Sequence, residues 1–521
     1  MRRVGLAFAL ALCLAGAHAA VARWIAGAAG FPLDDAWIHA RLARSLAEGR
    51  GFSFNPGEPA AVSSAPLWTL LVSVPAAAAI PFPWAAYLAG AAAGAALSLL
   101  GFRLTERATG DSKAGLLCAA LLLGTHPFPW SIASGMEPAF AAALALATLL
   151  AALSGRMVIT FLLASAAGLA RPELCLMPGF VLLDALCRLQ RPGPKRIARL
   201  SLAALAATAA PFLIDRLLTG QYVFAALAAK VGRHGVIAAL GEGRADLVPS
   251  ILAANLPLYF VPLLRALARD NVALLVLAPI GLWRLAASGR GSHLAWMVFI
   301  LLPTAVAVLA PFGGPEFHEQ RYIGPVVAIM VVAGCVAWAA IPTGPPARGL
   351  RLAALVLVAA LSAWGSAAGL LRYAREVKNI NEMQVKIGRW LLERPGGPGT
   401  IATNDIGAIG FVTGAPILDL TGLATREVVP YLRRPPAPGS SNRGWNGASE
   451  SGLLEFLRVR RPDYVAVFPA WYPSRFFREA LGREVFRVDL DDNVICGDRS
   501  MIVYRPEWAA SEPLRGEGSG R

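Results

Sequence analysis

Long apolar stretches separated by short polar connections run through most of this chain. Runs rich in Leu, Ala and Val recur from residue 4 to residue 371, and several approach the roughly 20 residues that an α-helix needs to cross a bilayer. We therefore expect an α-helical polytopic membrane protein with about eleven transmembrane helices. The expected helices lie near residues 4–29, 84–102, 114–126, 138–154, 157–170, 174–187, 200–214, 271–287, 294–311, 322–341 and 351–371.

Two further apolar stretches, residues 66–80 and 248–268, fit this arrangement better as interfacial or re-entrant segments. If both 66–80 and 84–102 crossed, the basic residues that follow residue 102 would face outwards, although Lys and Arg are enriched in cytoplasmic loops. Prolines and an arginine interrupt 248–268, and this favours a helix that lies along the membrane surface. Trp68 and Trp84 suit an interfacial position, because tryptophan is enriched where lipid meets water.

The charges around the first apolar run indicate its orientation. Arg2 and Arg3 predict a cytoplasmic N-terminus, so the loop over residues 30–65 is expected outside. The first residues also resemble a signal peptide, with the cleavage-like sequence "AHA" at 17–19. Because the stretch of low polarity continues to Gly30, we favour an uncleaved signal-anchor helix.

From residue 372 the pattern changes. The sequence "REVKNINEMQVKIGRWLLERPGGPG" predicts an amphipathic helix that ends in a break rich in Pro and Gly. Short β-like runs follow at 400–403, 408–413, 416–420, 464–469, 484–488 and 501–505, with helical pieces at 450–459 and 475–481. We expect a transmembrane domain over residues 1–371, an extracytoplasmic α/β domain over residues 372–510 and a disordered tail over residues 511–521.

Charge and cysteine content exclude some classes of function. The net charge is +15 at pH 7, but the basic residues gather in short loops expected on the cytoplasmic side, such as 187–199. Because no compact basic domain is present, we expect no nucleic-acid partner. The six cysteines are scattered and lack CxxC spacing, so the sequence predicts neither a disulfide framework nor a cysteine metal site.

Polar residues outside the cytoplasmic loops collect on the outer side of the expected topology. Ionisable groups at a membrane edge are costly and are therefore candidates for function. Acids and bases that converge at one face from separate helices suit a site for an anionic, lipid-linked substrate. The candidates are Asp34, Asp35, His39 and Arg41 in the first outer loop, Glu137 in the second, Arg171 in the third, Lys230 in the fourth, and His318, Arg321 and Tyr322 in the fifth.

The adjacent acids Asp34 and Asp35 have two interpretations. If residues 34–49 are helical, Asp34 lies on the side of Arg41, and Asp35 points with Leu42 towards the apolar side. A carboxyl group directed to low dielectric has a raised pKa, which suits a general base. The simpler alternative is a helix N-cap, in which Asp accepts hydrogen bonds from free N–H groups. We favour function, because two successive acids after a membrane helix are costly to desolvate.

Arg171, Lys230 and Arg321 are candidate ligands of a phosphate group. Arg grips phosphate through two parallel hydrogen bonds and Lys supplies a point charge; alternatively, each side chain snorkels to lipid head groups. The alternative for His318 is an ordinary polar loop, and the alternative for Glu137 is an acid at a helix start. Metal-ligand spacing is absent around His318, and the HExxH, GxSxG and Walker-type motifs are absent from the chain.

The stretch "DDAWIHARLARSLAEGRGFSFNPGE" at residues 34–58 resembles the first outer loop of GT-C type membrane glycosyltransferases. It is most similar to the branch that contains the mycobacterial terminal arabinofuranosyltransferase and related bacterial proteins. Further pieces occur in the same order: "SGMEPAF", "ARPE", "AAKVG", "RYIGP", "NDIGAIGF" and "RPDYVAV". The tail of the first loop, "EPAAVSSAPLW", lacks the Glu-Gly often found before the Ser, so the sugar is not inferred from the arabinose enzymes.

The resemblance implies that a sugar is moved from a polyprenyl-phosphate donor to an acceptor glycan, lipid or protein, usually with inversion. It places the reaction at the outer face of the bacterial cytoplasmic membrane. The first-loop acid of the family maps onto Asp34, with Asp35 beside it, as the base that deprotonates the acceptor hydroxyl. Basic residues at helix ends would hold the donor phosphate, for which Arg171, Lys230 and Arg321 are our choices. Polyprenyl phosphate is itself the leaving group, so a divalent cation is not obligatory; the acid pair would be its ligand if one binds.

A carrier or flippase for a lipid-linked glycan is the alternative, with the same charges along a transport pathway. Many secondary transporters contain internal repeats, which this sequence lacks, and the charges here collect at one face. A cell-envelope scaffold in which the acids are only caps is a third interpretation. We favour the transferase.

Overall fold

The computed structural model describes residues 2–188, 193–220, 236–241, 243–287, 292–309, 314–433 and 448–508. The chain divides into two compact units, Met1–Lys378 and Asn379–Arg521. This division falls a few residues beyond the boundary predicted at residue 371. The predicted tail, residues 511–521, lies outside the described residues.

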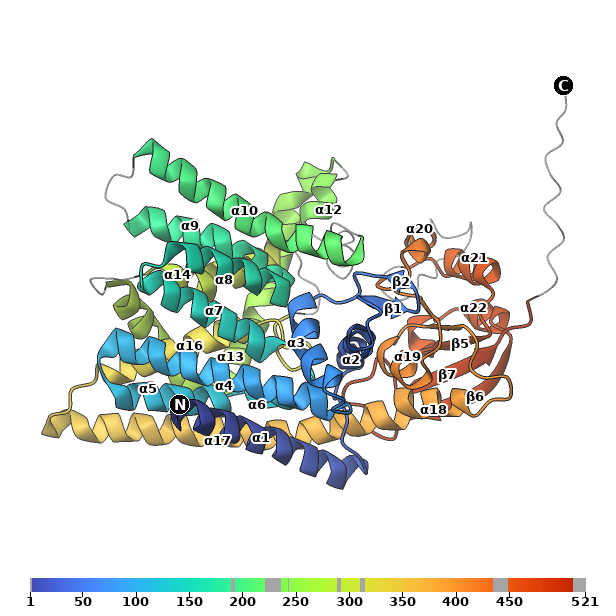
Figure 1. The fold of residues 1–521 in the computed structure, drawn as a ribbon, viewed down its shortest axis with the longest axis horizontal. Coiled ribbons are helices and arrows are strands. Elements are labelled where there is room, and N and C mark those ends of the chain that lie inside the picture. Colours follow the sequence, from blue (N-terminus) through green and yellow to red (C-terminus); the bar gives the residue numbers. More distant parts are fainter. Residues whose placement is uncertain are drawn as a thin grey trace. The chain divides into compact units, whose positions relative to one another are not determined.

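The first unit is built almost entirely of helices (Figure 1), and they occupy every stretch predicted to be transmembrane as far as the structure describes it. A small hairpin of β1 (Ser53–Asn55) and β2 (Glu58–Pro59) follows α2. The α-helices are α1 (Arg2–Ala26), α2 (Asp34–Ala47), α3 (Pro66–Ala77), α4 (Trp84–Thr109), α5 (Ser112–Gly124), α6 (Phe128–Ser134), α7 (Pro138–Leu153), α8 (Met157–Ala170), α9 (Met177–Arg188), α10 (Pro194–Thr219), α12 (Val236–Gly241), α13 (Val248–Ala287), α14 (Leu294–Trp296), α15 (Leu302–Leu309), α16 (Gly324–Ala339) and α17 (Pro345–Ile380). Single helical turns η1 (Pro172–Leu176), η2 (Ala245–Leu247) and η3 (Met297–Leu301) adjoin them.

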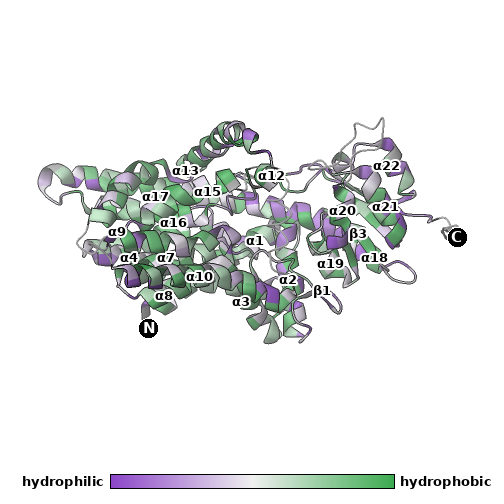
Figure 2. Cartoon of the chain, turned by 90° about the horizontal axis from the view of Figure 1, so that it is seen from above, coloured by the Kyte–Doolittle hydropathy of each residue, from purple (hydrophilic) through white to green (hydrophobic). Residues whose placement is uncertain are grey.

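Several of these helices have the length and composition of membrane spans. Among the described residues, 5 helices are long and apolar enough to cross a bilayer, and the bent pair α5 and α6 would make a sixth. Others, including α7, α8 and α16, are apolar but shorter. Figure 2 shows that hydrophobic residues dominate the helices of this unit. The chain is thus a multi-pass membrane protein, while the count of about eleven spans remains a prediction.

The stretch predicted to lie at the interface, residues 248–268, forms the first part of α13. Helix α13 consists of two helical pieces that meet at a kink at Asn271. The Asn271 side-chain amide donates hydrogen bonds to the carbonyl of Val358 and to the hydroxyl of Ser362, each at 3.0 Å. Residues 245–287 together make one of the candidate spans, so the segment predicted to be interfacial is joined to the predicted span that follows it.

Close packing of α4 against α6 fixes the loop that precedes α7. A Cβ atom on Gly90 of α4 would lie 2.0 Å from the carbonyl oxygen of Ile132 in α6, so only glycine fits at this crossing. Helix α6 ends at Ser134 and is capped by Gly135, whose φ is +74°. Helix α7 starts with Pro138 in its first turn, where the fixed φ of proline suits a helix. The short loop between them carries Glu137.

Trp68 lies inside the protein, while its predicted position at the membrane interface stays a prediction. Its side chain is 0% exposed, and Nε1 donates a hydrogen bond of 2.8 Å to the carbonyl of Gly135. The indole N–H thus has a hydrogen-bond acceptor inside the protein. Trp84, by contrast, is exposed.

The second unit contains a five-stranded sheet in the order β4-β3-β5-β7-β6. β3 pairs in parallel with β4 and β5, and β7 pairs antiparallel with β5 and β6. The strands are β3 (Ile401–Thr403), β4 (Ile417–Asp419), β5 (Tyr464–Val467), β6 (Arg483–Asp489) and β7 (Ser500–Arg505). The helical elements are η4 (Asn381–Val385), α18 (Lys386–Leu392), α19 (Gly407–Thr413), η5 (Arg426–Val428), α20 (Val429–Leu432), α21 (Glu450–Arg460), η7 (Pro469–Trp471) and α22 (Arg475–Ala480).

One predicted strand is a helix. Residues 408–413 form most of α19, which connects β3 to β4. These two strands are parallel neighbours, and parallel strands need a crossover connection that a helix can supply. The helix predicted to start near residue 372 also differs, because α17 runs through this position to Ile380.

Candidate active site

Helix α2 carries the acid pair as its first two residues, since Leu33 occupies the N-cap position. The prediction that this helix has one polar and one apolar side is wrong, because Arg41 and Ser45 are buried as well as Leu42. The β1–β2 hairpin explains the burial of the arginine: Arg41 Nε donates a hydrogen bond of 2.7 Å to the carbonyl of Phe54, and its guanidinium lies 4.3 Å from the Phe54 ring centre. Burial lowers the pKa of Arg41 to about 10.

Asp35 pairs with Arg321, which is distant in the sequence. Arg321 Nη1 donates a hydrogen bond of 2.6 Å to Asp35 Oδ2. The Asp35 side chain is 39% exposed and that of Arg321 is 5% exposed. A buried guanidinium group therefore faces Asp35, in place of the apolar surroundings that the helical periodicity predicted. Asp34 precedes it on the same helical turn and is partly exposed.

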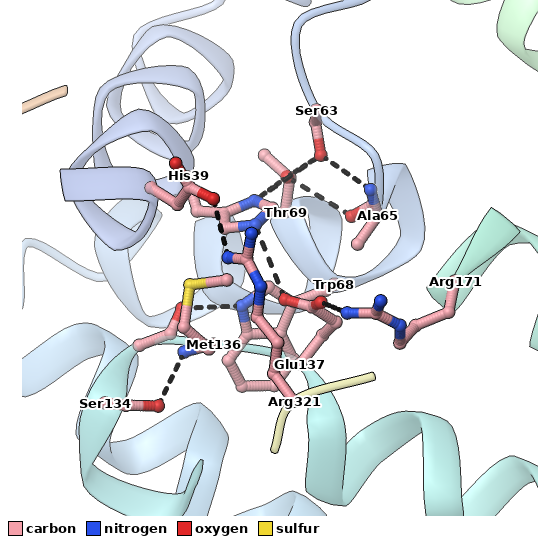
Figure 3. A network of polar contacts seen from close by, with 12 residues as sticks. His39, Ser63, Ala65, Trp68, Thr69, Ser134, Met136, Glu137, Arg171 and Arg321 are labelled. Carbon is pink, nitrogen blue, oxygen red and sulfur yellow. Dashed lines mark hydrogen bonds and ion pairs between the residues drawn. The ribbon is translucent and has the colours of Figure 1, made fainter. Parts of the chain in front are cut away.

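Glu137 lies at the centre of a buried polar network (Figure 3). Its side chain is 1% exposed, and it accepts a hydrogen bond from Arg171 Nη1. His39 Nε2 lies 3.7 Å from the other carboxylate oxygen. Arg171 also forms an ion pair with Glu173. Residues from three of the predicted outer loops thus meet at Glu137.

The ring of Tyr322 contacts two guanidinium groups. The guanidinium carbons of Arg171 and Arg321 lie 4.7 Å and 5.0 Å from the ring centre. Arg321 Nη2 also donates a hydrogen bond of 2.9 Å to the Tyr322 hydroxyl. Aromatic faces attract cations, so Tyr322 holds two buried positive charges near each other and next to Asp35.

A pair of hydroxyl groups supports His39. His39 Nδ1 shares a hydrogen bond of 2.9 Å with Thr69 Oγ1, which lies 3.0 Å from Ser63 Oγ. An ionised Glu137 can only accept hydrogen bonds, so the imidazole nitrogen that faces it must carry the proton. This arrangement therefore favours the tautomer of His39 with its proton on Nε2. The hydroxyl pair thereby orients the imidazole towards the carboxylate.

The partners in this network determine its charges. Burial raises the pKa of Glu137, but the charge of Arg171 and the contact with His39 outweigh it, and the pKa falls to about 2. Burial lowers the pKa of Arg171 and of Arg321, but neighbouring acidic groups raise both pKa values above the ordinary one. Both arginines therefore stay charged beside an ionised Glu137.

We expect Glu137 to make the folded protein less stable in acid. Its pKa of about 2 lies below the ordinary value of 4.5, so the unfolded chain binds the proton first. The stabilisation is complete above the ordinary value and is lost as the pH falls towards 2. The apparent melting temperature of the wild type should fall more steeply than that of Glu137→Gln between about pH 5 and about pH 3. Parallel falls in the two proteins would contradict this assignment.

A left-handed turn immediately precedes Arg321. His318, Glu319 and Gln320 have φ angles of +46°, +55° and +60°. The left-handed helical conformation costs a residue with a side chain about 1–2 kcal/mol, so three in succession persist only where the surroundings hold them. The placement of Arg321 and Tyr322 therefore follows from a strained backbone segment.

The structure brings most of the predicted site residues together, and the network includes Asp35, His39, Glu137, Arg171, Arg321 and Tyr322. Arg41 binds the hairpin instead, and the His318 ring stacks on Phe317 with the ring centres 3.6 Å apart. Lys230 lies outside the described residues. In the part of the chain that the structure describes, no group of three or more His, Cys, Asp and Glu side chains could hold a metal ion. Divalent-cation binding by the acid pair stays a prediction.

The sequence pattern did not single out Thr69 or two buried acids in apolar helices. Asp270 in α13 is 3% exposed, and Glu376 in α17 is 0% exposed. Glu376 accepts a hydrogen bond of 2.8 Å from Trp130 Nε1. Each of the two acids directly follows an arginine in the sequence, so neither stands out there as a lone acid in an apolar stretch.

Comparison with known sequences concerns only the C-terminal part. Residues 376–508 match the model of a family described as a domain of unknown function, DUF8728. No curated protein matches the chain at a significant level.

Solved structures resemble the chain over nearly its whole length. ArnT from Cupriavidus metallidurans bound to undecaprenyl phosphate has a TM-score of 0.57 and 13% identity, covering 96% of this chain and 97% of that chain. The same protein in the apo state has a TM-score of 0.51 and 14% identity, covering 90% and 92%. The archaeal oligosaccharyltransferase AglB from Archaeoglobus fulgidus, in complex with an inhibitory peptide and a dolichol-phosphate, has a TM-score of 0.53 and 13% identity, covering 98% and 75%.

At these identities the similarity concerns the fold alone. Both proteins were solved with a polyprenyl-type phosphate, and AglB is an oligosaccharyltransferase. The narrower likeness to the arabinofuranosyltransferase branch remains a prediction from the sequence. The chain has the fold of ArnT and AglB.

Proposed function

We propose that this protein is an inverting glycosyltransferase that moves a sugar from a polyprenyl-phosphate donor to a cell-envelope glycan, lipid or protein. The observation that carries the proposal is the cationic pair Arg171 and Arg321, which is held by Tyr322 beside the acids of α2. Two solved structures of the same fold were obtained with a polyprenyl-type phosphate, undecaprenyl phosphate in one and dolichol-phosphate in the other. This supports the donor class.

Asp34 is the proposed general base. Its carboxylate takes the proton of the acceptor hydroxyl, whose oxygen forms a bond to the anomeric carbon while the bond from that carbon to the phosphate oxygen breaks. Attack opposite the leaving group inverts the configuration. Asp35 accepts a hydrogen bond from Arg321 at 2.6 Å, which supports a role for Asp35 in orienting that arginine. The base function then falls to Asp34, the residue onto which the resemblance maps the first-loop acid.

Arg171 and Arg321 are the proposed phosphate ligands. The leaving polyprenyl phosphate gains negative charge as the bond breaks, and preorganised cations lower the energy of that state. Among the described residues, the buried Nε atom of Arg321 has no hydrogen-bond partner, so a donor remains for a phosphate oxygen. Tyr322 fixes the guanidinium planes through its ring and hydroxyl.

The proposed location is the cytoplasmic membrane of a bacterium. The N-terminus lies in the cytoplasm, and the second unit and the acid pair lie on the outer side. The basic short loops of the sequence support this orientation. In this orientation the site would bind lipid-linked donors at the outer surface of the membrane.

A transfer assay with purified full-length protein in liposomes tests the function. A panel of radiolabelled polyprenyl-phosphate sugars is offered with cell-envelope acceptors, and sugar nucleotides and protein-free liposomes serve as controls. We expect one lipid-linked donor to be consumed with release of polyprenyl phosphate, and a product of inverted anomeric configuration. Consumption of no donor, together with movement of labelled lipid across the bilayer, would establish a carrier instead.

A further inference from the structure

The left-handed turn over residues 318–320 has side-chain contacts that hold it to three different helical regions. Glu319 accepts from Arg372 Nη1 of α17 at 3.0 Å, and its other carboxylate oxygen lies 3.3 Å from His126 Nε2, which precedes α6. Gln320 Nε2 donates a hydrogen bond of 2.8 Å to Asp270 Oδ1 of α13. Glu319 and Gln320 are 8% and 0% exposed. Both side chains thus point into the first unit.

The next two residues face the candidate active site. Arg321 binds Asp35, and Tyr322 lies against Arg321 and Arg171. The backbone is continuous, so the orientation of these two side chains depends on the preceding φ angles. A residue with a Cβ atom disfavours a left-handed φ, whereas glycine adopts it without that penalty. The contacts of Glu319 and Gln320 therefore oppose the tendency of the turn to relax.

We propose that Glu319 and Gln320 are positioning residues that clamp this turn and so hold Arg321 and Tyr322 in a phosphate-binding arrangement. The proposal rests on the proposed function, because it takes Arg321 as a ligand of the donor phosphate. Neither positioning residue contacts the substrate. Each acts through the backbone of the turn, with Asp270, Arg372 and His126 as the fixed points.

Two substitutions of Gln320 separate the effect of its hydrogen bond from the effect of the left-handed backbone conformation. Gln320→Ala removes the hydrogen bond to Asp270 and keeps the Cβ atom, so the turn relaxes and the arrangement that binds phosphate becomes a minor state. Gln320→Gly removes the same hydrogen bond but also removes the cost of the left-handed conformation, so more of the turn stays in place. Ala79→Gly is the matched control, because Ala79 has a φ of +60° in the exposed segment after α3.

The measurements are the dissociation constant for undecaprenyl phosphate and the apparent melting temperature of the full-length protein in lipid nanodiscs. If about one tenth of the molecules keep the binding arrangement, Gln320→Ala weakens binding about tenfold. Gln320→Gly should stay within about threefold of the wild type, for the same reason. Gln320→Gly should also melt at a higher temperature than Gln320→Ala, which reverses the usual order of these residues in regular structure. Ala79→Gly should leave binding unchanged.

Two results would overturn the clamp. One is equal affinity of Gln320→Ala and Gln320→Gly, whether both are weakened or both match the wild type, because the strained turn then has no part in binding. The other is a lower melting temperature of Gln320→Gly than of Gln320→Ala. Absence of undecaprenyl phosphate binding by the wild type would refute the proposed function instead, and the order of the melting temperatures would still decide whether the turn is clamped. As a further control, Glu319→Gln, which keeps the shape but loses the charge that pairs with Arg372, should weaken binding less than Glu319→Ala.

Discussion

Asp34→Asn should reduce the rate of sugar transfer by about 10²–10⁴-fold while leaving donor binding nearly unchanged. Asparagine has the shape of aspartate but cannot take the proton of the acceptor hydroxyl. The effect should therefore fall on kcat, with the dissociation constant for the donor within about twofold of the wild type. Initial rates with saturating donor, together with binding of undecaprenyl phosphate, measure the two quantities separately.

Asp35→Asn should behave differently, because Asp35 accepts a hydrogen bond from Arg321 at 2.6 Å. The loss of this charge frees the guanidinium group, so KM for the donor should rise more than kcat falls. Asp246→Asn is the matched control, since Asp246 is an acid whose side chain is 66% exposed and pairs with a nearby arginine. Full activity of Asp34→Asn would remove Asp34 as the base, and full activity of both variants would place the reaction elsewhere.

Arg171→Met should strongly destabilise the protein. Arg171 and Glu137 are a buried ion pair, with side chains 4% and 1% exposed, and removal of one partner leaves a buried charge without its counterion. Breaking such a pair costs about 3–5 kcal/mol. The apparent melting temperature in detergent, measured with and without undecaprenyl phosphate, should fall sharply.

The double variant Glu137→Gln with Arg171→Met should recover part of this stability, because it removes both charges. Arg244→Met supplies the control for loss of an arginine, since the Arg244 side chain is 54% exposed and its ion pair is on the surface, where such a pair is worth about 0–1 kcal/mol. A melting temperature of Arg171→Met equal to that of the wild type would show that the pair does not support the site.

The sequence predicted much of the site because its chemistry is visible in short stretches. Acids after a helix, and arginines at helix ends, are unusual in an apolar chain, so Asp35, Arg171 and Arg321 could be named. Their mutual contacts follow from how the helices pack, which spacing along the chain does not show. The ion pair between Asp35 and Arg321 joins residues 286 positions apart.

Other predictions failed where neighbouring elements changed the environment. Helix α2 was expected to have an apolar and a polar side, but the hairpin covers Arg41 and supplies the carbonyl of Phe54 as its acceptor. Residues 408–413 have β propensity, yet the parallel pairing of β3 and β4 requires the crossover that α19 makes. The left-handed turn at 318–320 contains no glycine, so the sequence has no residue that would predict positive φ angles there.

Helix α9 contains a buried acid, Asp184, whose partners are both near and far in the sequence. Asp184 accepts hydrogen bonds from Ser292 Oγ at 3.0 Å and from the backbone N–H of His293 at 2.7 Å. The two donors follow Asp184 by 108 and 109 residues in the sequence. Arg188, one turn along the same helix, pairs with Asp184 at 2.6 Å. Because Arg188 belongs to the same helix, Asp184 has a counterion that does not depend on the distant segment at residues 292–293.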